Sequence, residues 1–183
     1  QISKEINPHF YDMWTTDKPY IVCKGGRGSF KSSVISLKLV TMMMKYISQG
    51  KQVNIIAIRE NQQYLRDSVY NQILWAMSIL GVESEFRTRV SPMIIQHIRT
   101  GSTFYFYGAN DPMKLKSNIV GNVVAVWFEE FANLKNVDVF DQSVPTFIRQ
   151  KPNFTDQVKI YISYNPPRNP YAWVNEWVTQ REA

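Results

Sequence analysis

A glycine-rich segment that carries a lysine and two serines is the part of this chain whose residue types most directly predict chemistry. Residues 24–33 read Lys-Gly-Gly-Arg-Gly-Ser-Phe-Lys-Ser-Ser and lie between the apolar run Tyr20–Cys23 and an amphipathic stretch. Glycines let backbone N–H groups converge on phosphate oxygens, and the N-terminus of a following helix adds partial positive charge. The segment therefore predicts a phosphate-binding loop for ATP.

The residues of this loop have separate predicted roles. Lys31 is expected to reach the β- and γ-phosphates, and Ser32 to offer its hydroxyl to Mg²⁺. Arg27 lies close enough to neutralise charge that develops on the γ-phosphate during hydrolysis, and a solvent-facing loop arginine is an equal alternative. The predicted nucleotide-binding residues form one continuous set: Gly25, Gly26, Arg27, Gly28, Ser29, Phe30, Lys31, Ser32 and Ser33.

Phe30 departs from the usual pattern G-x-x-x-x-G-K-[ST], which has glycine directly before the lysine. We expect Phe30 to lie at or near the first helical turn, with backbone angles that suit any L-residue, so that glycine is dispensable there. The ring is also near enough to the phosphates to crowd them. Weak nucleotide binding or weak hydrolysis therefore stays open.

Two adjacent carboxylates form a second cluster. The apolar run Val123–Phe128 is typical of a strand buried on both faces, and Glu129 and Glu130 follow it. Ligands of open α/β sheets bind at the carboxyl ends of the strands. Glu129 is therefore predicted to hold Mg²⁺ and Glu130 to act as the general base toward the attacking water. The alternative is a solvated pair of glutamates at a strand end.

Polar residues also end two other predicted strands. Ser163 and Asn165 are placed to sense the γ-phosphate or to orient water, although a turn built by Asn165-Pro166-Pro167 explains them equally well. Arg59 is either a contact to nucleotide or DNA or a solvated charge.

Hydrophobic periodicity predicts the elements that position these residues. Strands alternate with helices, which implies a mainly parallel central sheet flanked by helices. A hairpin is expected within residues 93–107, around Thr100-Gly101-Ser102. Pro145 is expected to shorten or kink the last of the helices. The predicted strands are Tyr20–Cys23, Val53–Ile58, Val123–Phe128 and Val158–Ser163, and the predicted helices cover residues 32–48, 65–80 and 137–148.

Composition limits the class of protein. The 183 residues are 44% hydrophobic, which suits one domain with a substantial core, 1–183, and does not favour a disordered chain. The formal charge of +6 favours a polyanionic partner. The single cysteine, Cys23, is expected to be buried and inert. Because apolar runs stay far below about 18 residues, we expect a soluble protein with no membrane partner.

With these motifs in place, the chain resembles the N-terminal ATPase domain of the large terminase subunits of tailed bacteriophages. The similarity extends over nearly the whole sequence. It rests on four segments, which are residues 25–33, Ile58-Arg59 followed by Leu65-Arg66-Asp67-Ser68-Val69, Trp127-Phe128-Glu129-Glu130, and Ile162-Ser163-Tyr164-Asn165-Pro166-Pro167.

The resemblance implies a P-loop fold of the additional-strand, catalytic-glutamate type. It also implies Mg²⁺-dependent ATP hydrolysis that drives double-stranded DNA into a preformed capsid in the cytoplasm of the infected bacterium. The implied partners are DNA, a portal protein, a small terminase subunit and further copies of the chain in a ring. Lys116 and Arg149 are candidates for a basic residue supplied to a neighbouring subunit.

The same resemblance assigns residue roles. Lys31 and Ser32 are implied to contact phosphate and Mg²⁺, Glu129 and Glu130 to be the acidic pair, and Ser163 with Asn165 to couple hydrolysis to movement. Arg27 occupies the family's loop-arginine position. The C-terminal nuclease domain of the family is expected to be absent from this chain.

Two other functions remain open at this point. One is a helicase-like ATPase that moves on nucleic acid without packaging it. The other is a nucleotide-binding assembly module in which Phe30 has ended hydrolysis.

Overall fold

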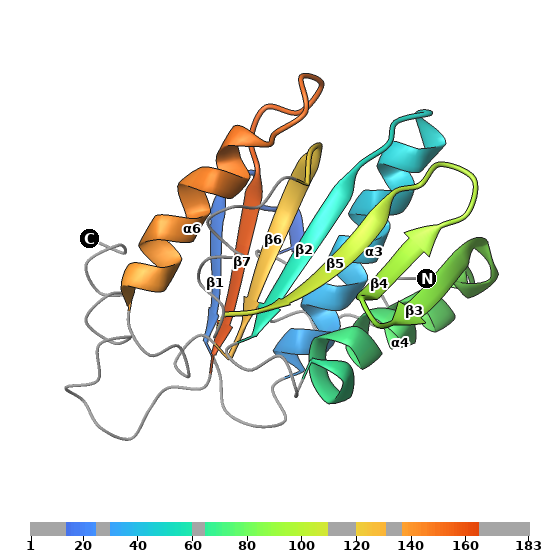
Figure 1. The fold of residues 1–183 in the computed structure, drawn as a ribbon, viewed down its shortest axis with the longest axis horizontal. Helices are drawn as coiled ribbons and strands as arrows, with labels where there is room; N and C mark the ends of the chain where they lie inside the picture. The colour runs from blue at the N-terminus through green and yellow to red at the C-terminus, as the bar shows by residue number, and fades with distance from the viewer. Residues whose placement is uncertain (1–13, 25–29, 60–64, 110–119, 131–136, 165–183) are drawn as a thin grey trace.

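The computed structural model describes residues 14–24, 30–59, 65–109, 120–130 and 137–164. The described residues form a mixed seven-stranded sheet with helices on both faces (Figure 1). Its strands are β1 (Tyr20–Lys24), β2 (Asn54–Arg59), β3 (Phe86–Val90), β4 (Met93–His97), β5 (Thr103–Gly108), β6 (Val123–Glu129) and β7 (Lys159–Tyr164).

The order of the strands across the sheet is β1-β7-β6-β2-β5-β4-β3. The first five of these strands pair in parallel, and β4 and β3 continue the sheet in the antiparallel sense. Each of the four strands predicted from the sequence is present, and so is the hairpin, which is formed by β4 and β5. The parallel part of the sheet brings the carboxyl ends of β1, β7, β6 and β2 to one edge.

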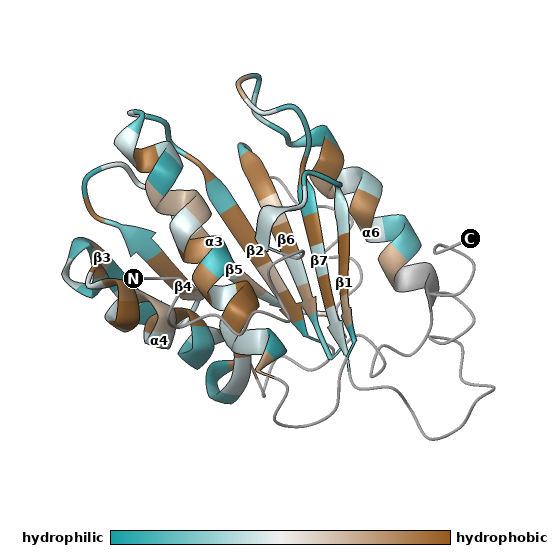
Figure 2. Ribbon diagram, turned by 180° about the vertical axis from the view of Figure 1, so that it is seen from behind, coloured by the Kyte–Doolittle hydropathy of each residue, from teal (hydrophilic) through white to brown (hydrophobic). Residues whose placement is uncertain are grey.

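Helices cover the two faces unequally (Figures 1 and 2). Helix α3 (Lys31–Ser48) and helix α4 (Asn71–Leu80) lie on one face, and α6 (Val137–Arg149) lies on the other. A π-helical segment, η3 (Arg66–Tyr70), leads into α4, and a short 3₁₀ turn, η4 (Glu83–Glu85), precedes β3. Among the described residues, no helix is long and apolar enough to cross a membrane.

Alternating side chains divide the interior into two cores. The residues of β6 are all buried, as expected of a strand covered on both faces. Trp127 and Ala125 pack beneath α3, whereas Val126 and Phe128 pack beneath α6. Phe128 meets Phe140 of α6 edge to face, with 4.7 Å between the ring centroids. The side chain of Glu129 therefore follows Trp127 onto the α3 face of the sheet.

Three sequence expectations need correction or extension. Phe30 lies near the first helical turn as expected, directly before α3, but its φ of 62° and ψ of 18° are in the left-handed region, so the expected backbone angles were wrong. Its carbonyl oxygen accepts a hydrogen bond from the Val34 N–H at 3.1 Å, so Phe30 is the N-cap residue of α3. Helix α6 continues past Pro145 to Arg149. Strand β3 was not predicted, because its exposed, arginine-bearing sequence lacks an apolar run.

Candidate active site

The carboxyl ends of the parallel strands bring residues from distant parts of the sequence into one row. Cys23 of β1 pairs with Ser163 of β7, and Ser163 pairs with Glu129 of β6. Arg59 ends β2, directly after the residue that pairs with Phe128. Side chains alternate along a strand, so the members of this row lie on the α3 face. The row therefore faces the first turn of the helix that follows the glycine-rich segment.

Lys31 begins α3 beside this row. It is buried, with 7% of its surface exposed. The positive charge of Lys31 acts to lower the pKa of both Cys23 and Glu129, which shows that the lysine is close to the ends of β1 and β6. Burial has the larger effect on Cys23 and raises the pKa of that thiol to about 12, so the thiol is inert as predicted. The fold thus brings the lysine and the carboxylate that were predicted from separate motifs to the same site.

Glu129 is a buried carboxylate whose negative charge is only partly balanced by neighbouring groups. It is 8% exposed, and Arg59 Nε lies 3.6 Å from its Oε2 atom. That distance makes an ion pair but exceeds a hydrogen bond, and Oε2 has no hydrogen-bond partner among the described residues.

The surroundings of Glu129 have opposing effects on its pKa. The pKa is raised from its ordinary value to about 7, mainly by burial, and the neighbouring Glu130 acts in the same direction. Arg59 is the strongest opposing influence, followed by Lys31 and a hydrogen bond from the Ser68 side chain. Near neutral pH this carboxyl is therefore poised between its charged and protonated forms, and any cation placed beside it favours the charged form.

The residues present fit a magnesium ion. Glu129 supplies a buried carboxylate oxygen without a hydrogen bond, and Ser32 supplies a hydroxyl in the first turn of α3. Magnesium prefers such oxygen ligands and usually takes only one or two from the protein, the rest being water and substrate phosphates. Among the described residues, no group of three or more histidine, cysteine, aspartate or glutamate side chains could hold a metal ion.

Glu130 follows β6 and is half-buried, with φ of 55°. Left-handed backbone is unfavourable for residues other than glycine by roughly 1–2 kcal/mol. Phe30, directly before α3, and Asn122, directly before β6, have the same conformation. Such conformations concentrate at functional sites because the surrounding structure holds a side chain in one required direction.

Ser163 has a second role beyond ending β7. Its hydroxyl accepts the indole N–H of Trp127 at 2.9 Å, and both side chains are buried. This bond joins β6 to β7 two residues before Glu129. A movement of Ser163 is therefore linked directly to the strand that carries the carboxylate.

The structure thus places Lys31 and Ser32, at the start of α3, on the side of the sheet edge where Glu129 and Ser163 end their strands and Glu130 follows; Phe30 directly precedes α3 and has 67% of its surface exposed. Arg149, a proposed neighbour-facing residue, ends α6, and its Nη2 atom lies 3.4 Å from Thr146 Oγ1. Several predicted residues lie outside the described part: Gly25, Gly26, Arg27, Gly28, Ser29, Lys116 and Asn165.

Sequence reasoning missed the contacts that two residues make with Glu129. Ser68 lies in the π-helical segment and contacts Glu129, although periodicity alone predicts an ordinary helix there. Arg59 was noted as a strand end, but its pairing with Glu129 required knowing that β2 and β6 are neighbours. A detectable signal existed only for the bond between Trp127 and Ser163, since a buried indole N–H needs an acceptor.

A parallel sheet with a buried lysine at the start of the helix after β1 and paired carboxylates at the end of β6 defines an α/β P-loop NTPase fold. The model of the phage terminase large subunit family matches residues 17–182, and the chain belongs to this family.

Similar proteins agree with this assignment. The terminase large subunit of Bacillus phage SPP1 is 30% identical over 185 residues, which cover 96% of this chain and 42% of that protein. The large terminase of a thermophilic bacteriophage, solved in complex with ADP, is 18% identical with a TM-score of 0.71, over 96% of this chain and 42% of that one.

The N-terminal domain of the DNA packaging ATPase from bacteriophage phi29 has a TM-score of 0.62 at 18% identity, over 94% of this chain and 86% of that domain. This chain therefore spans less than half the length of the SPP1 relative, but most of the phi29 domain, which was solved separately.

Proposed function

We propose that this chain is the ATP-hydrolysing motor domain of a phage large terminase, and that it powers movement of double-stranded viral DNA into a procapsid. The observation that carries this proposal is the convergence of Lys31 and the buried Glu129 at the carboxyl edge of the sheet. The similarity to a packaging ATPase domain, and to a large terminase solved with ADP and with ATP-gamma-S, supports it.

In this proposal the residues of the site divide the work of hydrolysis. Lys31 binds the β- and γ-phosphates, and the glycine-rich residues 25–29 surround them. Arg27 stabilises charge on the γ-phosphate as the bond to the β-phosphate breaks. Ser32 and Glu129 hold Mg²⁺, which when bound neutralises phosphate charge.

Glu130 is the general base that orients the attacking water and takes its proton. The strained backbone at Glu130 supports this role, because it directs the side chain independently of the strand's own alternation. Ser163 and Asn165 transmit the state of the site to the rest of the motor, and the hydrogen bond from Trp127 to Ser163 supports this role for Ser163.

The partners follow from the family and from charge. A net charge of +6 suits a protein that works on a polyanion. We propose that double-stranded DNA, a portal protein, a small terminase subunit and further copies of the chain in a ring are the partners, in the cytoplasm of the infected host. Lys116 or Arg149 would then be supplied to a neighbouring site.

The experiment that tests hydrolysis is steady-state phosphate release from this chain with Mg-ATP, at matched and verified nucleotide occupancy. Glu130→Ala should lower turnover by about 100-fold or more, because a positioned general base contributes that much. Nucleotide affinity should change little. Glu83→Ala, which removes an exposed carboxylate from η4, is the matched control and should behave as wild type.

Turnover that is equal in wild type and Glu130→Ala, with ATP bound to both, would refute an intrinsic ATPase in which Glu130 is the base. Packaging that survives Glu130→Ala in the full-length protein would refute the motor role and favour a binding-only assembly module.

A further inference from the structure

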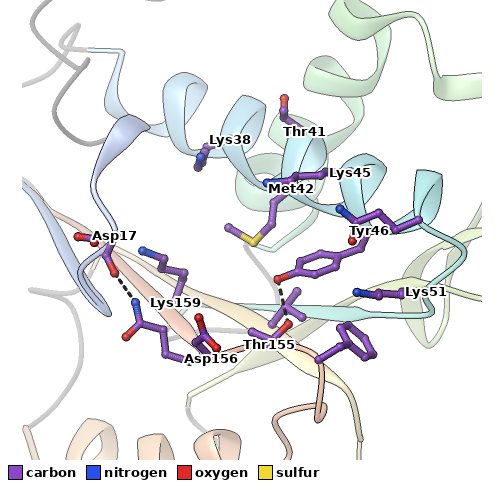
Figure 3. Close-up of a pocket in the computed structure, with 14 residues that line it drawn as sticks. Asp17, Lys38, Thr41, Met42, Lys45, Tyr46, Lys51, Thr155, Asp156 and Lys159 are labelled. Atoms are coloured by element: carbon purple, nitrogen blue, oxygen red, sulfur yellow. Dashed lines mark hydrogen bonds between the residues drawn. The ribbon is translucent and has the colours of Figure 1, made fainter.

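A charged cavity lies beside the part of α3 that is farther from the proposed nucleotide site (Figure 3). Its volume is about 390 Å³. One wall is a single face of α3, and the other is formed by the start of β7 and the segment before it. We call this cavity the lysine cleft, because Lys38, Lys45, Lys51 and Lys159 line it, together with two carboxylates, Asp17 and Asp156. The Lys51 ammonium lies 4.7 Å from the ring centroid of Phe154, which also lines the cleft.

Lys38 and Lys45 come from α3 and Lys159 from β7, and the charges of Lys159 and Lys45 both act on Lys38. Burial lowers the pKa of Lys38, and these two charges lower it further. No carboxylate is among the causes for Lys38, whereas the pKa of Lys159 is lowered by burial and raised by Asp17. The lining as a whole carries more lysines than carboxylates, so a net positive charge remains in the cleft.

Stabilising contacts within the fold explain only part of why Lys38, Lys45 and Lys159 lie around one cleft. A cation in the last turn of a helix is stabilised by the helix dipole, and Lys45 occupies that position. Lys38 lies about two turns earlier, where the dipole gives no such benefit, and its ammonium lies 5.1 Å from the centroid of the Trp14 ring. Lys159 donates to the carbonyls of Thr16 and Lys18 at 3.1 and 3.0 Å. An ammonium has three donors, so these bonds fix Lys159 and leave one donor beyond them.

The spacing of the lysines along α3 relates the cleft to the nucleotide site. Lys31, Lys38 and Lys45 recur every seven residues, which places them along one side of the helix. A rise of 1.5 Å per residue separates Lys31 from Lys45 by about 21 Å. An anion in the cleft would therefore be held by the same helix as the nucleotide, yet too far away to be part of its site.

We propose that the lysine cleft is a binding site for a phosphate group, separate from the nucleotide site. The phosphate belongs either to a small phosphorylated molecule or to the backbone of a nucleic acid, and the chemistry that recognises it is the same. Lys38 and Lys45 provide charge from α3, and Lys159 provides it from the opposite wall. This proposal does not depend on ATP hydrolysis by the chain.

The test is a titration of the isotope-labelled chain with inorganic phosphate, followed residue by residue through backbone amide NMR. Saturable shifts are expected for amides in residues 45–51 and 155–159, in addition to any at the start of α3. Lys45→Gln and Lys38→Gln should each weaken binding at the cleft about tenfold or more, because each removes a charge-assisted hydrogen bond. Arg99→Gln, which removes an exposed charge from the turn between β4 and β5, should leave it unchanged.

Several outcomes would overturn the proposal. These are the absence of saturable shifts at the cleft, shifts confined to the start of α3, or equal affinity in wild type, Lys45→Gln and Arg99→Gln. Lys45 is exposed, so its variant keeps the test valid even if Lys38→Gln fails to fold. Lys31→Ala should leave cleft binding intact while it removes nucleotide binding, which keeps a failure here distinct from a failure of the proposed ATPase.

A second titration distinguishes the source of the phosphate. A short DNA duplex that saturates the same amides more tightly per phosphate, with a steep dependence on salt, identifies a nucleic-acid backbone. Inorganic phosphate that binds as tightly as the duplex identifies a small phosphorylated ligand. Either result supports the site, provided that Lys45→Gln weakens it.

Discussion

Asn54 and Glu129, which are buried polar residues at opposite ends of the neighbouring parallel strands β2 and β6, satisfy their polar groups in opposite ways. At the amino end, Asn54 donates to the Gly121 carbonyl at 2.7 Å and accepts from Gln52 at 2.9 Å, while the Val53 N–H donates to Ser102 at 3.1 Å. These are neutral hydrogen bonds, and those to Gly121 and Ser102 connect the start of β2 with the starts of its neighbours β6 and β5. At the carboxyl end, Glu129 is buried beside charged residues with one oxygen left without a hydrogen bond.

This difference separates groups that hold the fold together from groups kept ready for a ligand. Buried polar groups that are fully bonded add stability and rigidity, whereas an incompletely bonded buried charge lowers stability. The carboxyl end tolerates that loss because a bound cation and phosphates would compensate it. Substitutions at the two ends should therefore have contrasting effects, which the following predictions test.

The largest effect is expected for Lys31→Ala. Removal of two charge-assisted hydrogen bonds to phosphate should weaken ATP binding by at least about 100-fold. Calorimetric titration with Mg-ATP measures this affinity, and circular dichroism checks that the variant is folded. Lys24→Ala, which removes an exposed lysine at the end of β1, is the control for general loss of charge. Equal affinity in Lys31→Ala and wild type would place the nucleotide elsewhere.

The pKa of Glu129 predicts a dependence of stability on pH. In the folded chain this pKa is about 7, above its ordinary value of 4.5. Between these pH values the folded state keeps a proton that the unfolded state has released, so the free energy of unfolding falls as pH rises. The fall should be about 3 kcal/mol and should be complete once the pH exceeds 7.

Glu129→Gln should remove this fall, since an amide does not titrate. Urea denaturation at pH 5 and pH 8, without nucleotide or divalent cation, measures the difference. Glu83→Gln, on the surface, should retain the wild-type dependence. A Glu129→Gln variant that loses as much stability as wild type over this pH range would show that the carboxyl is already ionised at pH 5.

Asn54→Ala, at the amino end of β2, should lower stability and leave nucleotide affinity nearly unchanged, in contrast to Lys31→Ala. The substitution removes the bonds from Asn54 to Gly121 and from Gln52 and Thr103 to Asn54. Loss of these buried hydrogen bonds should lower the free energy of unfolding by about 2 kcal/mol. Affinity for Mg-ATP should stay within about twofold, as measured by the same calorimetric titration. A larger loss of affinity with unchanged stability would contradict the separation of roles between the two ends.

Much of the fold was predictable because its signals are local. The apolar run Val123–Phe128 and the period of the helix after Lys31 each depend on burial of neighbouring residues in the sequence. The order of the strands was not predictable from those patterns, because β7 lies between β1 and β6 although it is last in the described chain. Strand β3 was missed for a related reason: most of its side chains are exposed, so its sequence carries no periodic signal.

The candidate site divides in the same way. The types of Lys31, Glu129 and Glu130 follow from motifs, since phosphate and metal chemistry require those groups. The state of Glu129 depends instead on its burial and on Arg59 and Ser68, which reach it only through the tertiary fold.

The smallest predicted effect concerns Phe30, where the sequence expectation was wrong. Its backbone has φ of 62°, and its side chain is 67% exposed. Phe30→Gly removes roughly 1–2 kcal/mol of left-handed strain while it adds flexibility to the unfolded chain, which costs about 0.4–1 kcal/mol. The variant should therefore be more stable by about 0.5–1 kcal/mol in urea denaturation. Phe30→Ala keeps the strain and removes the ring, so it should show no such gain. If both variants were equally stabilised, the exposed ring rather than the backbone would be the source of the cost.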